Sequence, residues 1–276
     1  MQKKIELSVQ ELEERAKAIR LATLEMIYRA GSGHPGPSLS TVDILTVLYF
    51  SVMKIQANNP SWPDRDRFIL SKGHAAPALY ATLAEAGFFP KEFLNTFRQV
   101  GLSLQGHPDM KSTPGVDMTS GALGNGVAIG AGMALAARLT KRTYRTYVLL
   151  GDGECQEGEV WEAAMAAPTK KLGNLTAIID RNGFNQTGCT ENSSSLEPLP
   201  DRWKAFGWRV LEIDGHSIKS LLEAFCWAAE SEEQPSLIIA KTIKGKGISF
   251  MEGKPEWHAK SLSSNEMAQA RIELKN

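Results

Sequence analysis

Residues 147–188 read YVLLGDGECQEGEVWEAAMAAPTKKLGNLTAIIDRNGFNQTG, and the fold class can be predicted from these residues. It begins with a short apolar and β-branched run, Tyr147 to Leu150, and contains a second such run, Leu175 to Ile179. Both runs are typical of buried strands. Between them, Glu159 to Ala167 is rich in helix formers and carries its apolar residues on one stripe. The stretch therefore predicts a strand–helix–strand crossover with parallel strands.

The turns that follow these two strands carry polar side chains suited to a cation. Asp152 lies between two glycines, and Asn182 precedes Gly183. The carboxyl ends of parallel strands meet at one edge of the sheet, where open α/β folds bind ligands. A carboxylate and an amide oxygen there suit a hard divalent cation that also takes phosphate oxygens, so the pair predicts magnesium with a diphosphate. The alternative is that each residue serves only its own turn.

Gly151, Asp152 and Gly153, followed by Asn182, resemble the thiamine diphosphate signature, in which GDG precedes an asparagine by about thirty residues. Together with this signature, further segments resemble, in order, the amino-terminal half of transketolase: SGHPG at 32–36, SKGH at 71–74, GHP at 106–108, GALGNG at 121–126 and WH at 257–258. The resemblance implies an α/β fold, the thiamine diphosphate-binding diphosphate domain. Its mostly parallel sheet is flanked by helices, and residues 1–276 are expected to form a single cofactor- and magnesium-binding domain.

Composition excludes several other classes of protein. The 31 basic and 31 acidic residues cancel, so no overall field favours nucleic acid or an acidic membrane surface. Cys155, Cys189 and Cys226 lack CxxC spacing, which argues against a disulfide framework or a zinc site and for a reducing compartment. The amino terminus has no apolar signal core, and no run is long enough to span a bilayer. We expect a soluble cytoplasmic protein without nucleic-acid or membrane partners.

The rest of the chain alternates predicted helices and strands. A capping-box pair, Ser8 and Glu11, begins a long helix that ends at Gly31. Further helices are predicted near Thr41–Val52, Ala75–Ala86, Lys91–Val100 and Ile218–Ala229, strands at Arg67–Leu70, Trp208–Ile213 and Ser236–Ala240, and loops at Gly31–Pro37 and Gly188–Asp201.

Four histidines lie in the loops and turns of the transketolase-like segments. The resemblance implies that His34 and His107 line the substrate channel, that His74 contacts the diphosphate and the substrate region, and that His258 lies over the diphosphate. Histidine suits the movement of protons on sugar hydroxyls because its pKa lies near neutrality. The structural alternatives are a loop histidine bonded to a neighbour and, for His74, a cap on the helix that follows.

The glycine-rich segment that begins at Gly121 allows two interpretations. Its later glycines could form a nicotinamide-cofactor fingerprint, but that motif needs a strand immediately before it, and residues 110–120 are too polar to predict one. A closely packed helix is the better interpretation, with Gly121, Ala122 and Leu123 touching the thiamine cofactor.

The resemblance also implies roles for residues between and beside the two turns. The backbone carbonyl of Phe184 is expected to be a third ligand of Mg²⁺, for which Ca²⁺ or Mn²⁺ can substitute. Glu157 and Glu162 match the family's paired acids at the subunit interface, which are thought to link two active sites. The alternative for both is a solvated acid near the positive end of a helix dipole.

Thiamine chemistry requires a ketose carbonyl to be attacked and a carbon–carbon bond to be broken. The resemblance therefore implies a transferase that moves a two-carbon ketol unit from a ketose, or its phosphate, to an aldose. The family takes the glutamate that protonates the aminopyrimidine ring from a second domain that this sequence does not contain. We therefore expect a separate carboxyl-terminal transketolase subunit, in an α2β2 heterotetramer.

Several alternatives remain open at this stage. Pentose phosphates are the default substrates, but a branched or sulfonated sugar is an alternative, because Ala122 and Arg181 depart from the more usual family residues. The cofactor-binding subunit of a 2-oxo-acid dehydrogenase shares the metal signature, although its chemistry does not need the four histidine segments. A nicotinamide-dependent dehydrogenase and a noncatalytic scaffold derived from the same fold complete the set.

Overall fold

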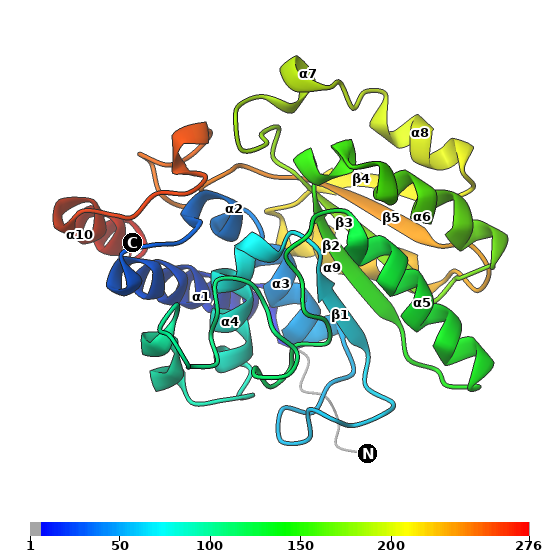
Figure 1. Cartoon of the computed structure of the whole chain (residues 1–276), viewed down its shortest axis with the longest axis horizontal. Coiled ribbons are helices and arrows are strands. Elements are labelled where there is room, and N and C mark those ends of the chain that lie inside the picture. The colour runs from blue at the N-terminus through cyan, green and yellow to red at the C-terminus, as the bar shows by residue number, and fades with distance from the viewer. Residues whose placement is uncertain (1–6, 276) are drawn as a thin grey trace.

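The structure is a computed structural model that describes residues 7–275. One sheet of five parallel strands runs in the order β1-β2-β3-β5-β4 (Figure 1). Its strands are β1 (Arg67–Leu70), β2 (Thr146–Gly151), β3 (Leu175–Arg181), β4 (Arg209–Asp214) and β5 (Ser236–Lys241). The predicted α/β class and the parallel pairing of the strands on either side of the crossover are confirmed.

Helices cover both faces of the sheet because parallel strands need crossover connections, and strand side chains alternate between the faces. One face packs against α5 (Asn125–Leu139), α6 (Gly158–Thr169) and α8 (Leu199–Ala205). The other packs against α1 (Val9–Ala30), α3 (Val42–Val47), α4 (Ala76–Glu85) and α9 (Ile218–Ala229). Figure 1 shows α5 and α6 side by side on their face of the sheet.

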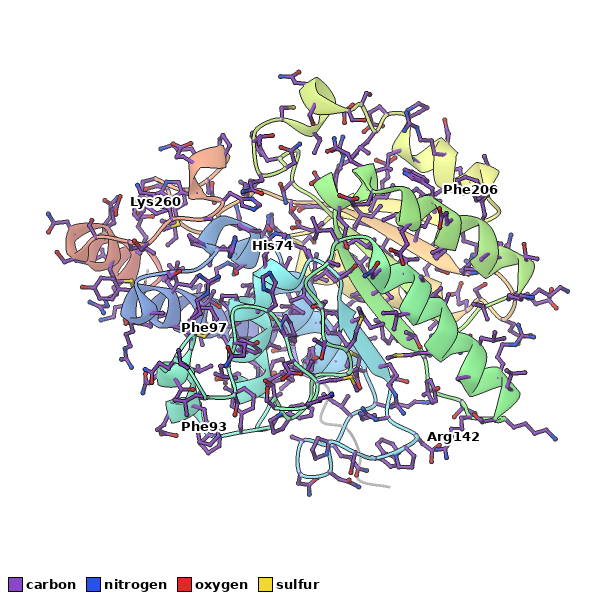
Figure 2. All side chains as sticks on the ribbon, in the orientation of Figure 1. His74, Phe93, Phe97, Arg142, Phe206 and Lys260 are labelled. Atoms are coloured by element: carbon purple, nitrogen blue, oxygen red, sulfur yellow. The ribbon has the colours of Figure 1, made fainter. Side chains whose placement is uncertain are left out.

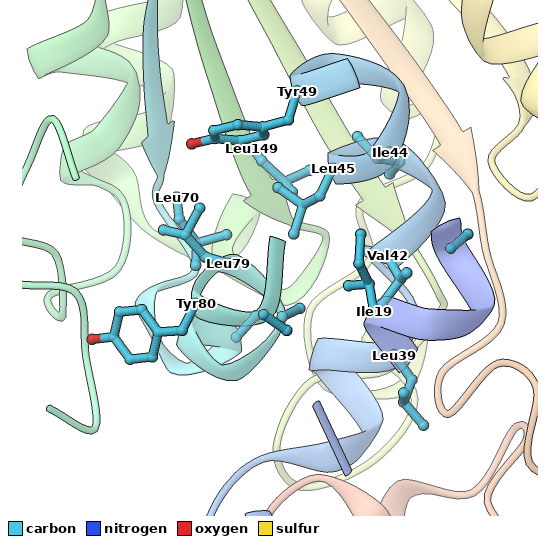
Figure 3. Close-up of a cluster of buried hydrophobic side chains, with 14 of the residues drawn as sticks. Ile19, Leu39, Val42, Ile44, Leu45, Tyr49, Leu70, Leu79, Tyr80 and Leu149 are labelled. Atoms are coloured by element: carbon cyan, nitrogen blue, oxygen red, sulfur yellow. The ribbon is translucent and has the colours of Figure 1, made fainter. Parts of the chain in front are cut away.

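Alternation along β2 divides the core between these two layers. Leu149 points to the α1 side and Val148 and Leu150 to the α5 side, and all three are fully buried. Figure 3 shows Leu149 among Leu45, Leu70 and Leu79. Each such side chain contributes about 1.5–3 kcal/mol through the surface that it removes from water. The packed core on both faces of the sheet therefore fixes the positions of the strand ends.

Local signals explain where the longest helix begins and ends. Ser8 and Glu11 form the predicted capping box at the start of α1, and Gly31, with φ 62°, ends it. A left-handed backbone of this kind favours glycine. The predictions for β1 and α9 also agree with the structure.

Other element predictions were wrong. The predicted loop after Gly31 contains a short helix, α2 (Pro35–Leu39), because Pro35 presets the first helical turn. The single helix predicted up to Val52 is divided in the structure: α3 ends at Val47, and a π-helical turn, η1 (Leu48–Val52), follows it directly. The helix predicted from Lys91 is only a 3₁₀ helix, η3 (Lys91–Thr96), beyond which Arg98 has a left-handed backbone.

Helices were also missed along the chain. The loop predicted from Gly188 contains α7 (Thr190–Ser193) and the start of α8. Near the carboxyl end, α10 (Ser264–Glu273) begins at a capping box between Ser263 and Glu266. The 3₁₀ turns η2 (Gly73–Ala75), η4 (Gly153–Gln156) and η5 (Pro255–Trp257) complete the described elements.

Residues 1–6, which the prediction of an absent signal core includes, lie outside the described residues. Within residues 7–275, no helix has both the length and the apolar character needed to cross a membrane.

Candidate active site

A cavity of about 390 Å³ lies at the carboxyl ends of β1, β2 and β3. It brings together most of the residues that the sequence singles out, from loops far apart in the chain: His34, His74, His107, Gly121, Leu123, Asp152, Gly153, Glu157, Asn182, Phe184 and His258. Figure 2 labels His74, which lies in the turn that follows β1. Ala122 and Glu162 are exposed and do not line the cavity.

Three histidine rings form a cluster in this cavity. The ring centroids of His34 and His74 are 5.3 Å apart, those of His74 and His258 are 5.1 Å apart, and those of His34 and His258 are 5.6 Å apart. His107 lines the same cavity, and its carbonyl oxygen accepts a hydrogen bond from Tyr80 at 3.0 Å. The carboxyl edge of the sheet therefore concentrates imidazole groups.

Burial keeps these imidazoles neutral at physiological pH. It lowers the pKa of His34 to about 4, with a further contribution from the charge of Arg98, and that of His258 to about 3, with a contribution from Lys244. The pKa values of His74 and His107 are lowered too, again chiefly by burial. A neutral imidazole keeps one acceptor nitrogen. Within the described part of the chain, the buried Nδ1 of His34 has no hydrogen-bond partner, so it is available to a ligand.

Asp152 lies at the floor of the cavity, at the end of β2. Its Oδ1 accepts from the backbone N–H of Gly153 at 2.8 Å, and its Oδ2 accepts from that of Gly183 at 2.5 Å. Arg181 donates to the same Oδ2 at 3.2 Å. Burial, and then the nearby charge of Asp180, raise the pKa of Asp152 to about 6. A bound cation would offset this cost of burying the carboxylate.

The amide of Asn182 is oriented by a buried charge that the sequence analysis did not single out. Asp180 Oδ2 accepts from Lys72 Nζ at 2.5 Å, from Ser40 Oγ at 2.7 Å and from Asn182 Nδ2 at 3.0 Å. Burial opposes ionisation, but the charge and hydrogen bond of Lys72 hold the pKa of Asp180 below its usual value. With its nitrogen committed to Asp180, Asn182 turns its oxygen toward the loop, where the backbone N–H of Phe184 donates to it at 3.1 Å.

Lys244 is a second cation that the sequence analysis missed, although it lies in the same basic tail as His258. Its Nζ is 3.0 Å from the carbonyl oxygen of Asn185 and 3.0 Å from Nδ1 of His258. Burial, and then the charge of Lys72, lower the pKa of Lys244 to about 8. Lys72 and Lys244 thus place two cations on the wall of the cavity.

Glu154 anchors the turn that carries Asp152. This buried carboxylate accepts from the backbone N–H of Gly124 at 2.8 Å and from that of Gly151 at 3.0 Å. A Cβ atom at Gly153 would lie 2.7 Å from the Cβ of Asn185, so this glycine lets the two loops pack closely. The glycines of the signature therefore shape the floor of the cavity.

The oxygen ligands in the cavity suit a metal ion that is also bound by the phosphate groups of a cofactor. Among residues 7–275, no group of three His, Cys, Asp or Glu side chains could hold a metal ion. Asp152 and Asn182 offer two hard oxygen ligands, which leaves most positions of an octahedral Mg²⁺ for a backbone carbonyl, water and phosphate oxygens. Lys244 suits the negative charge of such a phosphate group, whereas Lys72 is already paired with Asp180. The residues present are compatible with magnesium and a diphosphate.

The nicotinamide interpretation of the glycine-rich segment lacks its structural context. Among the described residues between η3 and α5, none forms a strand. An open, all-parallel α/β domain with oxygen ligands, cations and imidazoles at its carboxyl edge instead defines the class of domains that bind a phosphorylated cofactor. The family described as transketolase, thiamine diphosphate binding domain matches residues 12–275, and the chain belongs to this family.

Related proteins resemble the chain over nearly its whole length. The 6-deoxy-6-sulfo-D-fructose transketolase subunit SqwG of Clostridium sp. (strain MSTE9) is 46% identical over 264 residues, 96% of each chain. An apulose-4-phosphate transketolase subunit of Phocaeicola vulgatus is 45% identical, over 91% of this chain and 89% of that protein. These similarities confirm the predicted family.

A solved structure, transketolase from Campylobacter jejuni, superposes with a TM-score of 0.93 and 35% identity. The match covers 98% of this chain and 43% of that one. Human transketolase is 42% identical over 93% of this chain, which corresponds to 41% of its own length. The chain therefore spans less than half of these transketolases, and the predicted diphosphate-domain fold is confirmed.

Proposed function

We propose that this chain is the amino-terminal, cofactor-binding subunit of a two-subunit transketolase. The observation that carries the proposal is the cavity in which Asp152 and Asn182 face the cluster of His34, His74 and His258. Oxygen ligands alone would suit many phosphate sites, but three neutral imidazoles beside them suit the hydroxyl groups of a sugar. In this proposal, residues 1–276 act as a single domain that binds thiamine diphosphate and Mg²⁺.

The chain's own residues would hold the cofactor through charge and hard oxygen ligands. Asp152, Asn182 and the backbone carbonyl of Phe184 would bind the metal ion, and Lys244 would neutralise part of the charge of the diphosphate. Further contacts to the cofactor are assigned to His74, Gly121, Ala122, Leu123, Gly153 and His258. Thiamine diphosphate, when bound, supplies a carbon nucleophile and an electron sink for breaking a carbon–carbon bond.

The histidines would orient the sugar and move its protons. All four histidines line the cavity, where the rings of His34, His74 and His258 cluster and His258 contacts Lys244. We assign His34 and His107 to the substrate channel. The neutral rings of His34, His74 and His107 could each accept a hydroxyl proton at one nitrogen. Nδ1 of His258 lies 3.0 Å from Nζ of Lys244, so in the neutral ring the other nitrogen carries the proton and would donate to an oxygen of the ligand.

We assign the aminopyrimidine-binding half of the site to a separate carboxyl-terminal subunit, in an α2β2 heterotetramer. The proteins named as subunits, which this chain matches over nearly their whole length, support this assignment. Glu157, at the cavity, and Glu162, exposed on α6, keep their predicted role at the interface between subunits. Free thiols at Cys155, Cys189 and Cys226 are consistent with a cytoplasmic protein.

A second candidate concerns the substrate. The relatives at 46% and 45% identity are named for a sulfonated sugar and a branched sugar phosphate, whereas human transketolase is 42% identical. This ranking favours an unusual anionic sugar over ordinary pentose phosphates. The cofactor-binding subunit of a 2-oxo-acid dehydrogenase is disfavoured, because its chemistry does not need the histidine cluster.

Native mass spectrometry of the chain purified from its own host, in magnesium buffer, tests the proposal. We expect a second polypeptide and thiamine diphosphate to travel with it. In Asp152→Ala the cofactor should be lost, with its affinity lowered at least about a hundredfold, because removal of a direct metal ligand should cost no less than removal of a residue that supports one. A chain that carries neither partner nor cofactor, or that performs ketol transfer alone, would contradict the proposal.

A further inference from the structure

Arg181 connects the candidate metal site to a loop that follows it. It is the last residue of β3, and strand alternation turns its side chain away from Asp180. One guanidinium nitrogen donates to Asp152 Oδ2 at 3.2 Å and to Thr190 Oγ1 at 2.8 Å. The other donates to Glu191 Oε1 at 2.8 Å and to Glu197 Oε1 at 3.0 Å. Three carboxylates and a hydroxyl thus converge on one cation.

The loop that Arg181 reaches forms a wall of the cavity. Asn185, Gln186 and Thr187 line the cavity, and the two ends of their loop are joined by a hydrogen bond from Thr190 N to Gly183 O at 3.0 Å. Beyond the loop, α7 begins at Thr190 and lies at the rim of the molecule in Figure 1. Because Arg181 bonds to Asp152 and Thr190 with one nitrogen, it fixes the loop relative to the floor of the cavity.

Glu191 and Glu197 extend this connection along the chain. Glu191 also accepts from Ser195 Oγ at 2.7 Å and from the backbone N–H of Leu196 at 3.2 Å. Glu197 accepts from the backbone N–H of Leu199, the first residue of α8, at 2.9 Å. The side chain of Arg181 is only 13% exposed, so its charge is less screened than that of a surface arginine.

We propose that Arg181 is a positioning residue that couples cofactor binding to the order of residues 183–197. This inference rests on the proposed function. The guanidinium holds the carboxylate of Asp152 and the cavity-lining loop in one arrangement, so that a ligand entering the cavity meets a preformed wall. Without this cation, Asp152, Glu191 and Glu197 repel one another, and the loop moves away from the floor. Binding must then order the loop at the expense of affinity.

Two measurements on the full 276-residue chain test this coupling. The affinity for thiamine diphosphate with Mn²⁺ is measured by calorimetry and by the electron paramagnetic resonance of free Mn²⁺. Loop order is measured as the rate at which a glutamyl endopeptidase cleaves after Glu191, with the exposed Glu232 as an internal reference. In Arg181→Met we expect about tenfold weaker binding and about tenfold faster cleavage after Glu191, because a largely buried charge partner is removed. The cofactor should slow this cleavage in the wild-type chain.

Two further variants separate coupling from general loss of structure. Arg181→Lys keeps the charge beside Asp152, but a single ammonium cannot span the same four acceptors. It should recover only part of the affinity, and resistance to cleavage after Glu191 should return to the same partial extent. Arg142→Met removes an exposed partner of Asp64, whose Oδ1 lies 2.8 Å from Arg142, and should change neither measurement.

The outcomes distinguish the two proposals. If the wild-type chain binds thiamine diphosphate with Mn²⁺ neither alone nor in complex with the partner subunit, the proposed function fails. If the wild-type chain binds and Arg181→Met retains both its affinity and its resistance to cleavage, the role of Arg181 is refuted and the proposed function stands. A change in only one of the two measurements in Arg181→Met would also refute the coupling.

Discussion

Both edges of the sheet bury a carboxylate. At the amino edge it bonds to the backbone of the fold, and at the carboxyl edge it also lines the candidate active site. At the amino edge, Asp66 Oδ1 and Oδ2 accept from the backbone N–H groups of Arg145 and Lys54, each at 2.8 Å. At the carboxyl edge, Asp152 shares its oxygens with Gly153, Gly183 and Arg181 beside an open cavity. Both carboxyls have a raised pKa, with burial as the main cause. A perturbed pKa by itself therefore does not identify a functional group.

Cavity size does not identify the functional edge either. A cavity of about 630 Å³, larger than the candidate active site, lies near the amino ends of β1 and β2. Its lining is mostly apolar. Its Arg145 is bonded within the fold, since the guanidinium donates to the carbonyl oxygens of Gly173 at 2.8 Å and Ala228 at 2.9 Å. The carboxyl edge differs because several polar side chains face one cavity and can still form hydrogen bonds or metal bonds with a ligand.

The largest expected effect separates chemistry from stability at the carboxyl edge. If the proposed function holds, His74→Ala, in the complex with the proposed partner subunit, should lower the rate of ketol transfer by about 10²- to 10⁴-fold, the usual cost of removing a group that moves a proton. Thermal unfolding of the chain should change little. Steady-state kinetics and calorimetry check this, and a variant with near wild-type rates would remove His74 from the mechanism.

Asp66→Asn should have the opposite profile. The amide places a donor NH₂ against one of two backbone N–H groups, so we expect a loss of about 1–3 kcal/mol in the free energy of unfolding. The affinity for thiamine diphosphate should stay unchanged. Urea unfolding measures the loss of stability, and calorimetric titration measures the cofactor affinity. A weakened cofactor affinity in a fully folded variant would show that the two edges are not independent.

His34 at the carboxyl edge and Asp66 at the amino edge should contribute to the pH dependence of stability with opposite signs. Burial lowers the pKa of His34 from 6.5 to about 4. As the pH falls, His34 is therefore protonated in the unfolded chain before it is protonated in the folded one. Its contribution to stability is lost as the pH falls from about 6.5 to 4. The raised pKa of Asp66 has the reverse consequence: its stabilising contribution is present below the unfolded value of 3.8 and is lost as the pH rises through the folded value.

His34→Gln isolates the histidine part of this pH dependence. The substitution should remove about 1–2 kcal/mol of acid-induced destabilisation, after a discount for partial solvent screening of His34. The comparison is between the unfolding free energies of the two proteins at pH 7 and pH 4.5. Parallel pH profiles would show that His34 does not titrate as its burial requires.

The smallest effect is expected on the exposed face of α6. Glu162→Gln should change the free energy of unfolding by less than about 0.5 kcal/mol, and the cofactor affinity of the isolated chain not at all, because this side chain lies outside the cavity. A change confined to assembly with the partner subunit, measured by analytical ultracentrifugation, would support the predicted interface role. A change in the isolated chain would contradict it.

The sequence alone determined the strands, their parallel pairing and most of the candidate site. Short apolar runs such as Leu175–Ile179, ended by Asp180 and the residues after it, reveal both a buried strand and the edge at which it ends, since strand period and turn chemistry are local properties. The histidines could be found because their flanking glycines and prolines resemble a known family. The same local logic failed where a helix depends on distant contacts, as in α7, or where proline starts one within a loop, as in α2.

The pairing of the buried charges could not be predicted from the sequence, because it depends on tertiary contacts. Lys72, 108 residues before Asp180, pairs with it, and Lys244 reaches His258 from the segment that follows β5. Arg181 joins Asp152 to Glu191 and Glu197, although nothing in its sequence context indicates these partners. Spacing along the chain predicts which residues share an edge of the sheet, but the partner of a buried charge depends on which side chains from other elements meet it there, and that is a property of packing.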